Sequence, residues 1–338
     1  MGAIKKATKG LGKRLTKISL ITLLVLGLVA HLVNRNTDES IESLNGYHNN
    51  DSSGHHVKGE DGYYYEEEIQ TELPYILGVG DDEHFTTEGI VYVTFLDVGQ
   101  GDSIIIRSDD GVALIDAGSE KYAHRIIAYL EHSNVDFIDV VVATHPHADH
   151  IGGLIDVLGN FEVGVVYMPN AVHTTRTFER FIDRIEQNQI PIQFLSGGDI
   201  FELGVLEFAV FSPNEDHNDL NNMSLVLRME HFTNSFLFAA DAEELAEVDM
   251  INFGYNLTAD VLKVGHHGSA TSTTRDFLQA VNPTYAIIQT GDYNQFGHPH
   301  NTILNRLASA GVSVYRTDIH GNIRFYSDGF NLLYSTGR

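Results

Sequence analysis

Residues 140–154 read VVVATHPHADHIGGL, and this stretch joins a buried strand to a cluster of polar side chains. The β-branched run at 140–142 is typical of a strand that is buried on both faces. Three histidines and an aspartate follow within six residues, namely His145, His147, Asp149 and His150. Because residues two apart in an extended loop point the same way, His145 and His147 can share one ion, while Asp149 and His150 can turn toward a second. Imidazole with carboxylate is the ligand mix of Zn²⁺ or Mn²⁺, so the stretch predicts one or two divalent ions.

Four further motifs follow the same pattern of an apolar strand that ends in polar residues. They read FLDVGQGDS at 95–103, LIDAG at 114–118, VLKVGHHGS at 261–269 and GHPH at 297–300. Taken in this order with the HxHxDH cluster, they resemble the metallo-β-lactamase superfamily. Within it they are similar to the hydrolase domain at the C-terminus of ComEC-type competence DNA-uptake proteins. The resemblance covers residues 90–335 and implies an α/β fold, the αββα sandwich of two packed sheets with helices outside.

The resemblance also assigns the remaining metal ligands. The run FLFAAD ends in Asp241, which matches the family's bridging aspartate, although a helix N-cap is an alternative role for it. The ion shared by His145 and His147 is called metal one, and the ion beside Asp149 and His150 metal two. His267 is the expected ligand of metal two and His266 a pocket residue, with an exchange of these two roles as the alternative. Asp116 resembles the aspartate that braces a ligand histidine and fixes its tautomer.

One position departs from the wider superfamily, which usually supplies a third histidine to metal one before the bridging aspartate. This chain has Asn222 there, as the competence branch does. Asparagine is a poor Zn²⁺ ligand but an acceptable oxygen donor for a harder ion, so metal one is expected to be weak or Mn²⁺-like. The nearby His217 is an alternative ligand. The number of bound ions, one or two, therefore stays open.

Two residues are predicted to act in catalysis, Asp149 beside its ligand role and His298 as an imidazole that protonates a leaving oxygen. Asp97 and Asp102 stand at strand ends, where they either line the pocket or hold their loop together. His300 is expected to cap the helix that follows it.

Short apolar runs alternate with amphipathic stretches from residue 90 onward, as in a mixed α/β domain. Strands are expected at 91–96, 103–107, 112–115, 140–143, 163–168, 206–211, 224–229, 235–238, 261–264, 285–289, 312–315 and 323–326. Helices are expected at 121–132, 151–158, 176–187, 243–252, 273–280 and 301–310.

The first 88 residues, about a quarter of the chain, have a different composition. Residues 1–17 form a basic tail, which we expect to be cytoplasmic, and residues 18–33 are almost entirely apolar, long enough for a short membrane anchor. A cleaved signal peptide, which would leave a secreted protein, is the alternative. Residues 34–88 are polar and acidic and are expected to form a flexible linker. The hydrolase domain, residues 89–338, would then face the outside of a single-pass membrane protein.

Charge and cysteine content narrow the function further. The formal net charge is −25, and six of the 21 Lys and Arg residues precede residue 18, which leaves 15 against 46 Asp and Glu, a balance of −31. Such a surface repels polyanions, so a nucleic acid would have to be met by a local basic patch or by the metals. With no cysteine, the chain has neither disulfides nor thiolate ligands.

These features predict an extracellular, metal-dependent hydrolase in which metal-activated water attacks an electrophilic centre, and the resemblance implies that the bond attacked is a phosphodiester. By resemblance the substrate is DNA or another phosphate-ester polymer. The alternatives are an esterase that acts on cell-wall phosphate esters such as phosphorylcholine, and a non-catalytic metal-binding ectodomain. A β-lactam hydrolase is disfavoured by Asn222 and by the competence-type motifs.

Overall fold

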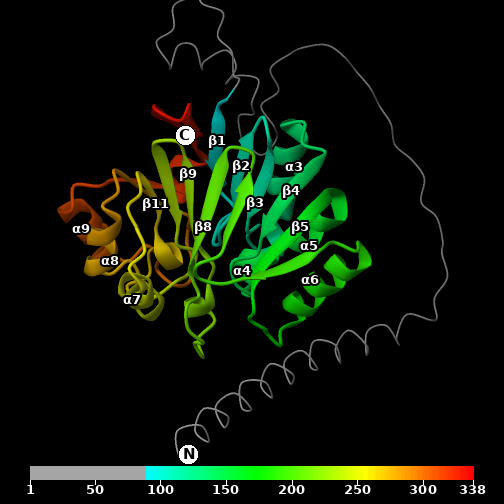
Figure 1. Ribbon diagram of the computed structural model, residues 1–338, viewed down its shortest axis with the longest axis horizontal. Coiled ribbons are helices and arrows are strands. Elements are labelled where there is room, and N and C mark those ends of the chain that lie inside the picture. Colours follow the sequence, from blue (N-terminus) through cyan, green and yellow to red (C-terminus); the bar gives the residue numbers. More distant parts are fainter. Residues whose placement is uncertain (1–88) are drawn as a thin grey trace, which may run out of the picture. The chain divides into compact units, whose positions relative to one another are not determined.

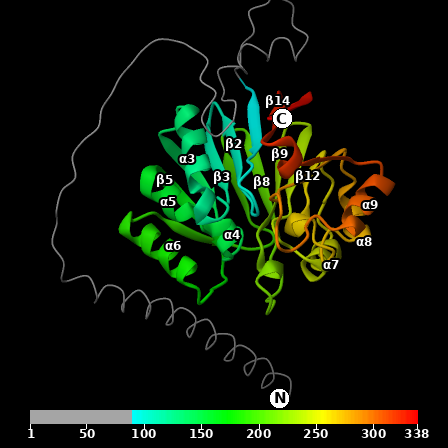
Figure 2. The same cartoon turned by 180° about the vertical axis from the view of Figure 1, so that it is seen from behind.

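The computed structural model describes residues 89–338, which form two packed β-sheets covered by helices on both outer faces (Figures 1 and 2). The predicted α/β sandwich is therefore confirmed. Within these residues no helix is both long and apolar enough to cross a membrane. The predicted anchor at 18–33 and the predicted linker at 34–88 lie outside the described residues.

The first sheet has eight strands in the order β15-β14-β1-β2-β3-β4-β5-β6. Their bounds are β1 Val91–Phe95, β2 Ile104–Ser108, β3 Gly111–Ile115, β4 Phe137–Val142, β5 Glu162–Pro169, β6 Ile192–Leu195, β14 Ile323–Ser327 and β15 Leu332–Thr336. Strands β3 to β6 run parallel to one another, whereas β1, β2, β14 and β15 pair antiparallel.

The second sheet has seven strands in the order β13-β12-β11-β10-β9-β8-β7. Their bounds are β7 Ile200–Leu203, β8 Leu206–Ser212, β9 Val226–His231, β10 Asn234–Phe238, β11 Val261–Lys263, β12 Tyr285–Ile288 and β13 Ser313–Arg316. Here β10 to β13 are parallel, so the carboxyl ends of the parallel strands of each sheet meet at one edge.

Helices cover the outer face of each sheet. Those beside the first sheet are α3 Ala123–His132, α4 Ala148–Ile151, α5 Leu154–Asn160 and α6 Arg176–Gln187 (Figure 1). Those beside the second are α7 Glu244–Phe253, α8 Arg275–Val281 and α9 Asn301–Ser309, and the short α10 Thr317–His320 joins β13 to β14. Single 3₁₀ turns lie at Glu120–Tyr122, Asn221–Met223 and Gly265–Gly268.

The alternation of side chains along the strands produces the layers. In β2, Ile104 and Ile106 pack between the two sheets, whereas Ile105 packs beneath the helices of the first sheet. In β3, Ile115 likewise packs between the two sheets and Leu114 beneath the helices. Because both faces of these strands are buried, their apolar residues are nearly continuous in sequence.

A buried carboxylate links α7 to α8. Glu247 is 1% exposed, and its side chain accepts hydrogen bonds from the backbone N–H groups of Thr273 and Thr274, at the start of α8. Burial raises the pKa of Glu247 to about 7. The carboxyl group therefore holds its proton in the folded chain at pH values where the unfolded chain has lost it.

We expect the stability contributed by this group to be complete below about pH 4.5 and to be lost as the pH rises through 7, by about 2 to 3 kcal/mol. Glu247→Gln keeps an acceptor oxygen but does not titrate. Between pH 5 and pH 8 the wild type should therefore lose unfolding free energy relative to the variant. Urea unfolding across this range tests it, and a constant difference would contradict the assignment.

Candidate metal centre

The polar residues singled out in the sequence follow strands whose carboxyl ends meet at one edge of the sandwich. Asp116 follows β3, the HxHxDH cluster follows β4, Asp241 follows β10, and the His266–His267 pair follows β11. Since β3 and β4 are parallel, as are β10 and β11, each sheet brings its own pair of loops together. The two packed sheets then bring these loops to a common site.

Close packing of the loops depends on glycine. A side chain on Gly153 would collide with the backbone carbonyl oxygen of Ala117, and one on Gly101 would collide with that of Asp149. Gly101 also has a φ of 136°, which side-chain-bearing residues rarely adopt. Glycine at these positions lets the loops that carry Asp116 and Asp149 lie directly against each other.

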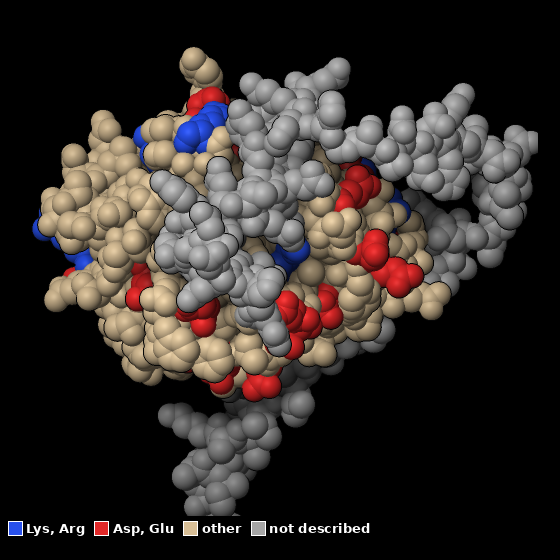
Figure 3. All heavy atoms as spheres, turned by 90° about the horizontal axis from the view of Figure 1, so that it is seen from above, with Lys and Arg blue, Asp and Glu red and all other residues tan. Residues whose placement is uncertain are grey.

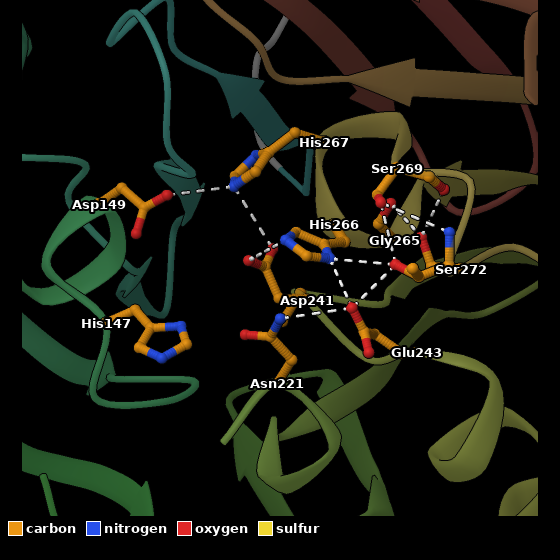
Figure 4. A network of polar contacts seen from close by, with 12 residues as sticks. His147, Asp149, Asn221, Asp241, Glu243, Gly265, His266, His267, Ser269 and Ser272 are labelled. Atoms are coloured by element: carbon orange, nitrogen blue, oxygen red, sulfur yellow. Dashed lines mark hydrogen bonds and ion pairs between the residues drawn. The ribbon is translucent and has the colours of Figure 1, made fainter. Parts of the chain in front are cut away.

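Two groups of potential ligands converge on one carboxylate (Figure 4). His145, His147 and Asp241 form the first, with Nε2 of His145 lying 3.0 Å from Nδ1 of His147 and 3.7 Å from Oδ2 of Asp241. The second group comprises Asp149, His150, Asp241 and His267. Within each group the ligand atoms all lie within 4.8 Å of one another. Asp241 belongs to both groups and is thus placed to bridge two ions, as the sequence predicted.

The unpaired atoms of this cluster fit a divalent cation. Among the described residues, Nε2 of His150, Nε2 of His267 and Oδ1 of Asp241 are buried without a hydrogen-bond partner. Yet Nε2 of His150 lies 3.3 Å from Oδ2 of Asp241, and Nε2 of His267 lies 3.4 Å from Oδ1 of Asp241 and 3.5 Å from Oδ2 of Asp149. Leaving such atoms unpaired is costly, and metal coordination would satisfy all of them. Imidazole and carboxylate donors suit Zn²⁺ or Mn²⁺.

Burial and charge act in opposite directions on the histidines. Burial disfavours the charged form of His150, but Asp241 and Asp116 outweigh it and hold the pKa of His150 well above its usual range. Burial likewise opposes charge on His267, and Asp241 raises the pKa of that ring to about 9. Burial and the neighbouring His150 lower the pKa of His145. The carboxylates thus create a strongly negative environment in which positive charge is stabilised.

Two carboxylates outside the four-residue ligand group orient the buried histidines His150 and His267. Nδ1 of His150 lies 2.7 Å from Oδ2 of Asp116, which also accepts a 2.6 Å hydrogen bond from the Thr144 hydroxyl. Nδ1 of His267 lies 3.2 Å from Oδ1 of Asp102 and 3.0 Å from the carbonyl oxygen of Gln289. Each contact leaves the Nε2 atom directed at the cluster, which is how ligand histidines are usually held.

His266 is placed differently from its neighbour. Its Nδ1 atom lies 2.9 Å from Oε1 of Glu243, its Nε2 atom lies 3.7 Å from Oδ2 of Asp241, and its side chain is 22% exposed (Figure 4). The hydrogen bond from His266 lowers the pKa of Glu243 to about 2. Thr271 and Asn221 also donate to Oε1 of Glu243. His266 therefore lines the opening of the site, while His267 belongs to the buried ligand group.

Neither alternative ligand for metal one lies in the cluster. The side-chain oxygen of Asn222 accepts hydrogen bonds from the backbone N–H groups of Glu243 and Ala246, at the start of α7, so it serves as a helix cap. The expectation that this oxygen is available to a hard ion is wrong. Nε2 of His217 lies 2.9 Å from Oδ2 of Asp249, so this ring is likewise directed elsewhere. The first group thus has two imidazoles and one shared carboxylate.

Two other predicted residues, Asp97 and His300, lie outside the ligand groups. Asp97 lies outside both ligand groups, where it pairs with Arg125 and Arg338 and accepts from the backbone N–H of Gly99. It holds its loop together, which was one of its two expected roles. Nδ1 of His300 accepts from the backbone N–H of Ala270, so its side chain does not cap the helix that it precedes.

His298 lies beside the centre, with its ring 5.5 Å from that of His266 and 6.3 Å from that of His267. Burial and the neighbouring His267 lower the pKa of His298 to about 4. A ring with that pKa is neutral near pH 7 and lacks the proton that the predicted role as an acid requires. A neutral imidazole can still position a substrate oxygen through a hydrogen bond.

Sequence analysis missed two residues that support the site. Lys263 is completely buried at the end of β11, where its ammonium group pairs with Asp102 and donates to the carbonyl oxygen of Ala240 at 3.1 Å. Its signal was a lysine inside the apolar run VLKVG. Glu243 had the appearance of a surface residue in the first turn of a helix, and nothing local in the sequence marks it as a partner of His266.

Comparison with known proteins places this arrangement in a family. Over 252 residues, the chain is 32% identical to ComE operon protein 3 of Bacillus subtilis (strain 168), with 69% of this chain and 32% of that protein covered. It is 30% identical over 236 residues to competence protein ComA of Neisseria gonorrhoeae, with the same shares covered. The chain therefore spans about a third of the length of these curated relatives.

Among solved structures, the metallo-beta-lactamase fold protein YhfI from Bacillus subtilis aligns with a TM-score of 0.48 at 13% identity, covering 70% of this chain and 99% of that one. A sequence model of the metallo-beta-lactamase superfamily matches residues 96–292, a range that includes both ligand groups. The chain belongs to the metallo-β-lactamase superfamily, and it is similar to ComE operon protein 3 and to competence protein ComA.

Proposed function

We propose that this chain is a metal-dependent phosphodiesterase whose substrate is a nucleic acid, DNA in particular. One observation carries the proposal: Asp241 belongs to both ligand groups, so the site can hold two ions side by side. Paired ions are suited to in-line displacement at a phosphodiester, where negative charge develops on both the attacking and the leaving oxygen. When bound, the ions would supply Lewis-acid chemistry, which acidifies water and neutralises that charge.

The protein side chains around the cluster determine where a substrate approaches. Asp149 is 33% exposed, whereas His150, His267 and Asp241 are nearly inaccessible. The substrate therefore approaches from the side of Asp149 and of the partly exposed His266. Both His266 and His298 can donate or accept hydrogen bonds there and so orient phosphate oxygens.

The relatives support DNA among possible phosphodiesters, since one of them is described as a competence protein and the motifs resemble those of competence DNA-uptake proteins. The charge of the chain acts against a polyanion, because Asp and Glu side chains are spread over the face seen in Figure 3, with Lys and Arg few. The ions would then provide the main attraction for phosphate. The same acidity favours a second candidate, a small zwitterionic phosphate ester such as a phosphorylcholine diester, whose choline group carries a positive charge.

We further propose that residues 18–33 anchor the chain in the cell membrane with the hydrolase domain outside. The basic tail at 1–17 would stay in the cytoplasm because positive charge is retained there. External protease treatment of intact cells should release the domain, and protection of the domain in intact cells would contradict the proposed orientation.

Metal removal tests the proposed activity. Chelation should abolish cleavage of an oligonucleotide and of bis-p-nitrophenyl phosphate, and Mn²⁺ or Zn²⁺ should restore both. The binding of a DNA substrate should also depend steeply on salt, because log Kobs for a single strand falls by about 0.7 per contacted phosphate for each tenfold increase in salt concentration. The binding of a small ester should not show this dependence. Metal-loaded protein that cleaves neither substrate would favour the non-catalytic alternative.

A further inference from the structure

The loop between β12 and α9 exposes two aromatic side chains beside the metal centre. Tyr293 is 103% exposed and Phe296 is 53% exposed. Aromatic side chains usually bury most of their surface, so a pair left in solvent at the rim of a site is informative. A role in the core is excluded for Tyr293 by its exposure.

The backbone of this loop holds Tyr293 outward. Tyr293 has a φ of 56°, a left-handed conformation that a tyrosine adopts only when its surroundings enforce it. Asn294 enforces it here, because its side-chain nitrogen donates to the carbonyl oxygens of Gly291 and His298 at 3.0 and 2.6 Å, and its side-chain oxygen accepts from the N–H of His298 at 2.8 Å. The loop is thus a closed, hydrogen-bonded unit that presents the tyrosine ring to solvent.

Ring contacts connect this loop to the ligand groups. The ring of Phe296 stacks on His298 with a centroid distance of 5.6 Å and an interplanar angle of 25°. His298 in turn lies 6.3 Å from the ring of His267 at 29°. A planar group bound at Phe296 would therefore be separated from the ligand ring of His267 by two rings, and Tyr293 lines the same cavity as His298.

A cavity of about 360 Å³ adjoins the loop, and its polar lining consists of Asp292, Tyr293, Asn294, His298, Arg316 and Asp318. Arg316 is engaged by Asp318, with Nε lying 3.0 Å from Oδ1, so its charge is largely neutralised. With Asp292 on the same rim, the cavity repels phosphate but can accept hydrogen bonds from ring N–H and amino groups. Its chemistry fits a planar, hydrogen-bonding ring better than a phosphate.

We propose that Tyr293 and Phe296 form a stacking platform for an unpaired nucleobase next to the scissile phosphate, so that the site acts on single-stranded nucleic acid. This inference rests on the proposed phosphodiesterase function. Every base presents a face that stacks on an aromatic ring, which makes such a platform tolerant of sequence. In a duplex the faces of the bases are already stacked on their neighbours, so only a single strand or an open end can use the platform.

Single-stranded oligonucleotides with and without a base test the inference. Tyr293→Ala and Phe296→Ala should each raise KM for the base-bearing strand roughly 10-fold, and Tyr293→Phe, which keeps the ring, should restore the wild-type value. With an abasic site in place of the stacked nucleotide, wild type and the alanine variants should give the same KM. Phe330→Ala removes another exposed aromatic side chain, 72% exposed on a distant turn, and serves as the matched control.

A binding measurement separates this inference from the proposed function. A strand that contains 2-aminopurine should lose fluorescence on rapid mixing with the full chain, because stacking quenches that base, and Tyr293→Ala should abolish the loss. Two results would overturn the platform while hydrolysis itself stands. One is an equal KM for Tyr293→Ala and wild type on the base-bearing strand, and the other is that Tyr293→Ala raises KM as much on the abasic strand as on the base-bearing strand. If the wild type cleaves no oligonucleotide, the proposed function fails, and the fluorescence measurement alone then tests the platform. Quenching that requires Tyr293 would support the platform, and no quenching would overturn it.

Discussion

Replacing His147 or Asp241 by alanine is expected to lower metal-dependent hydrolysis by about 10³-fold or more while the fold stays intact. His147 is one of two imidazoles in the first ligand group. The oxygen of Asn222 adds no further donor, because it accepts hydrogen bonds at the start of α7. Asp241 belongs to both groups, so its loss should empty the centre more completely than the loss of His147. Measurements of kcat/KM together with the content of bound metal test both expectations.

The control for these variants is His124→Ala, which removes an exposed histidine from α3. It should retain wild-type activity and metal content. Far-ultraviolet circular dichroism should show the same secondary structure in all three variants. Full activity in both His147→Ala and Asp241→Ala would reject the proposed centre. Loss of activity without loss of metal from Asp241→Ala would reject its role as a bridging ligand.

The largest expected effect on stability comes from the buried ion pair of Lys263 and Asp102. Both side chains are almost inaccessible, at 0% and 2% exposure. Lys263→Met removes the cation and leaves the Asp102 carboxylate buried with only His267 and His150 to balance it. The unfolding free energy should fall by about 3 to 5 kcal/mol, because an uncompensated buried charge is costly. Urea unfolding of the metal-free chain measures this loss.

A double-mutant cycle distinguishes this cause from a simple packing defect. Asp102→Asn alone should also destabilise the fold, whereas combining it with Lys263→Met should recover much of the loss, since neither buried charge then remains. Asp102→Asn should additionally weaken metal binding by about 10- to 100-fold, because Asp102 orients His267. Strictly additive losses in the double variant would show that the pair is not coupled.

The fold was predictable because its central strands are buried on both faces. Such strands appear in sequence as short runs of mostly apolar residues, and those of β4 and β10 were located from that pattern. The edge strands β6, β7 and β15 were not predicted. Most of their residues are exposed or only partly buried, as in β6, where Ile192 and Phe194 face solvent, so their strand conformation depends on neighbours rather than on their own pattern.

The ligand side chains were predictable for a related reason. Parallel strands end at a common edge, so polar residues that terminate apolar runs must collect there, as His145, Asp241 and His267 do. The partners of those ligands were not predictable. Lys263 meets Asp102 across the joined sheets, and Glu243 meets His266 through two loops that are 23 residues apart in sequence.

By itself, the sequence determined the type of fold and the candidate metal-ligand side chains, because these depend on local patterns of burial and residue type and on motifs that resemble those of a known family. Only the tertiary structure decided that Asn222 caps a helix, that burial lowers the pKa of His298 and that Tyr293 stands in solvent on a cavity that His298 also lines. A side chain's hydrogen-bond partner, pKa and exposure depend on residues brought near it by folding, and no stretch of sequence around that side chain records them.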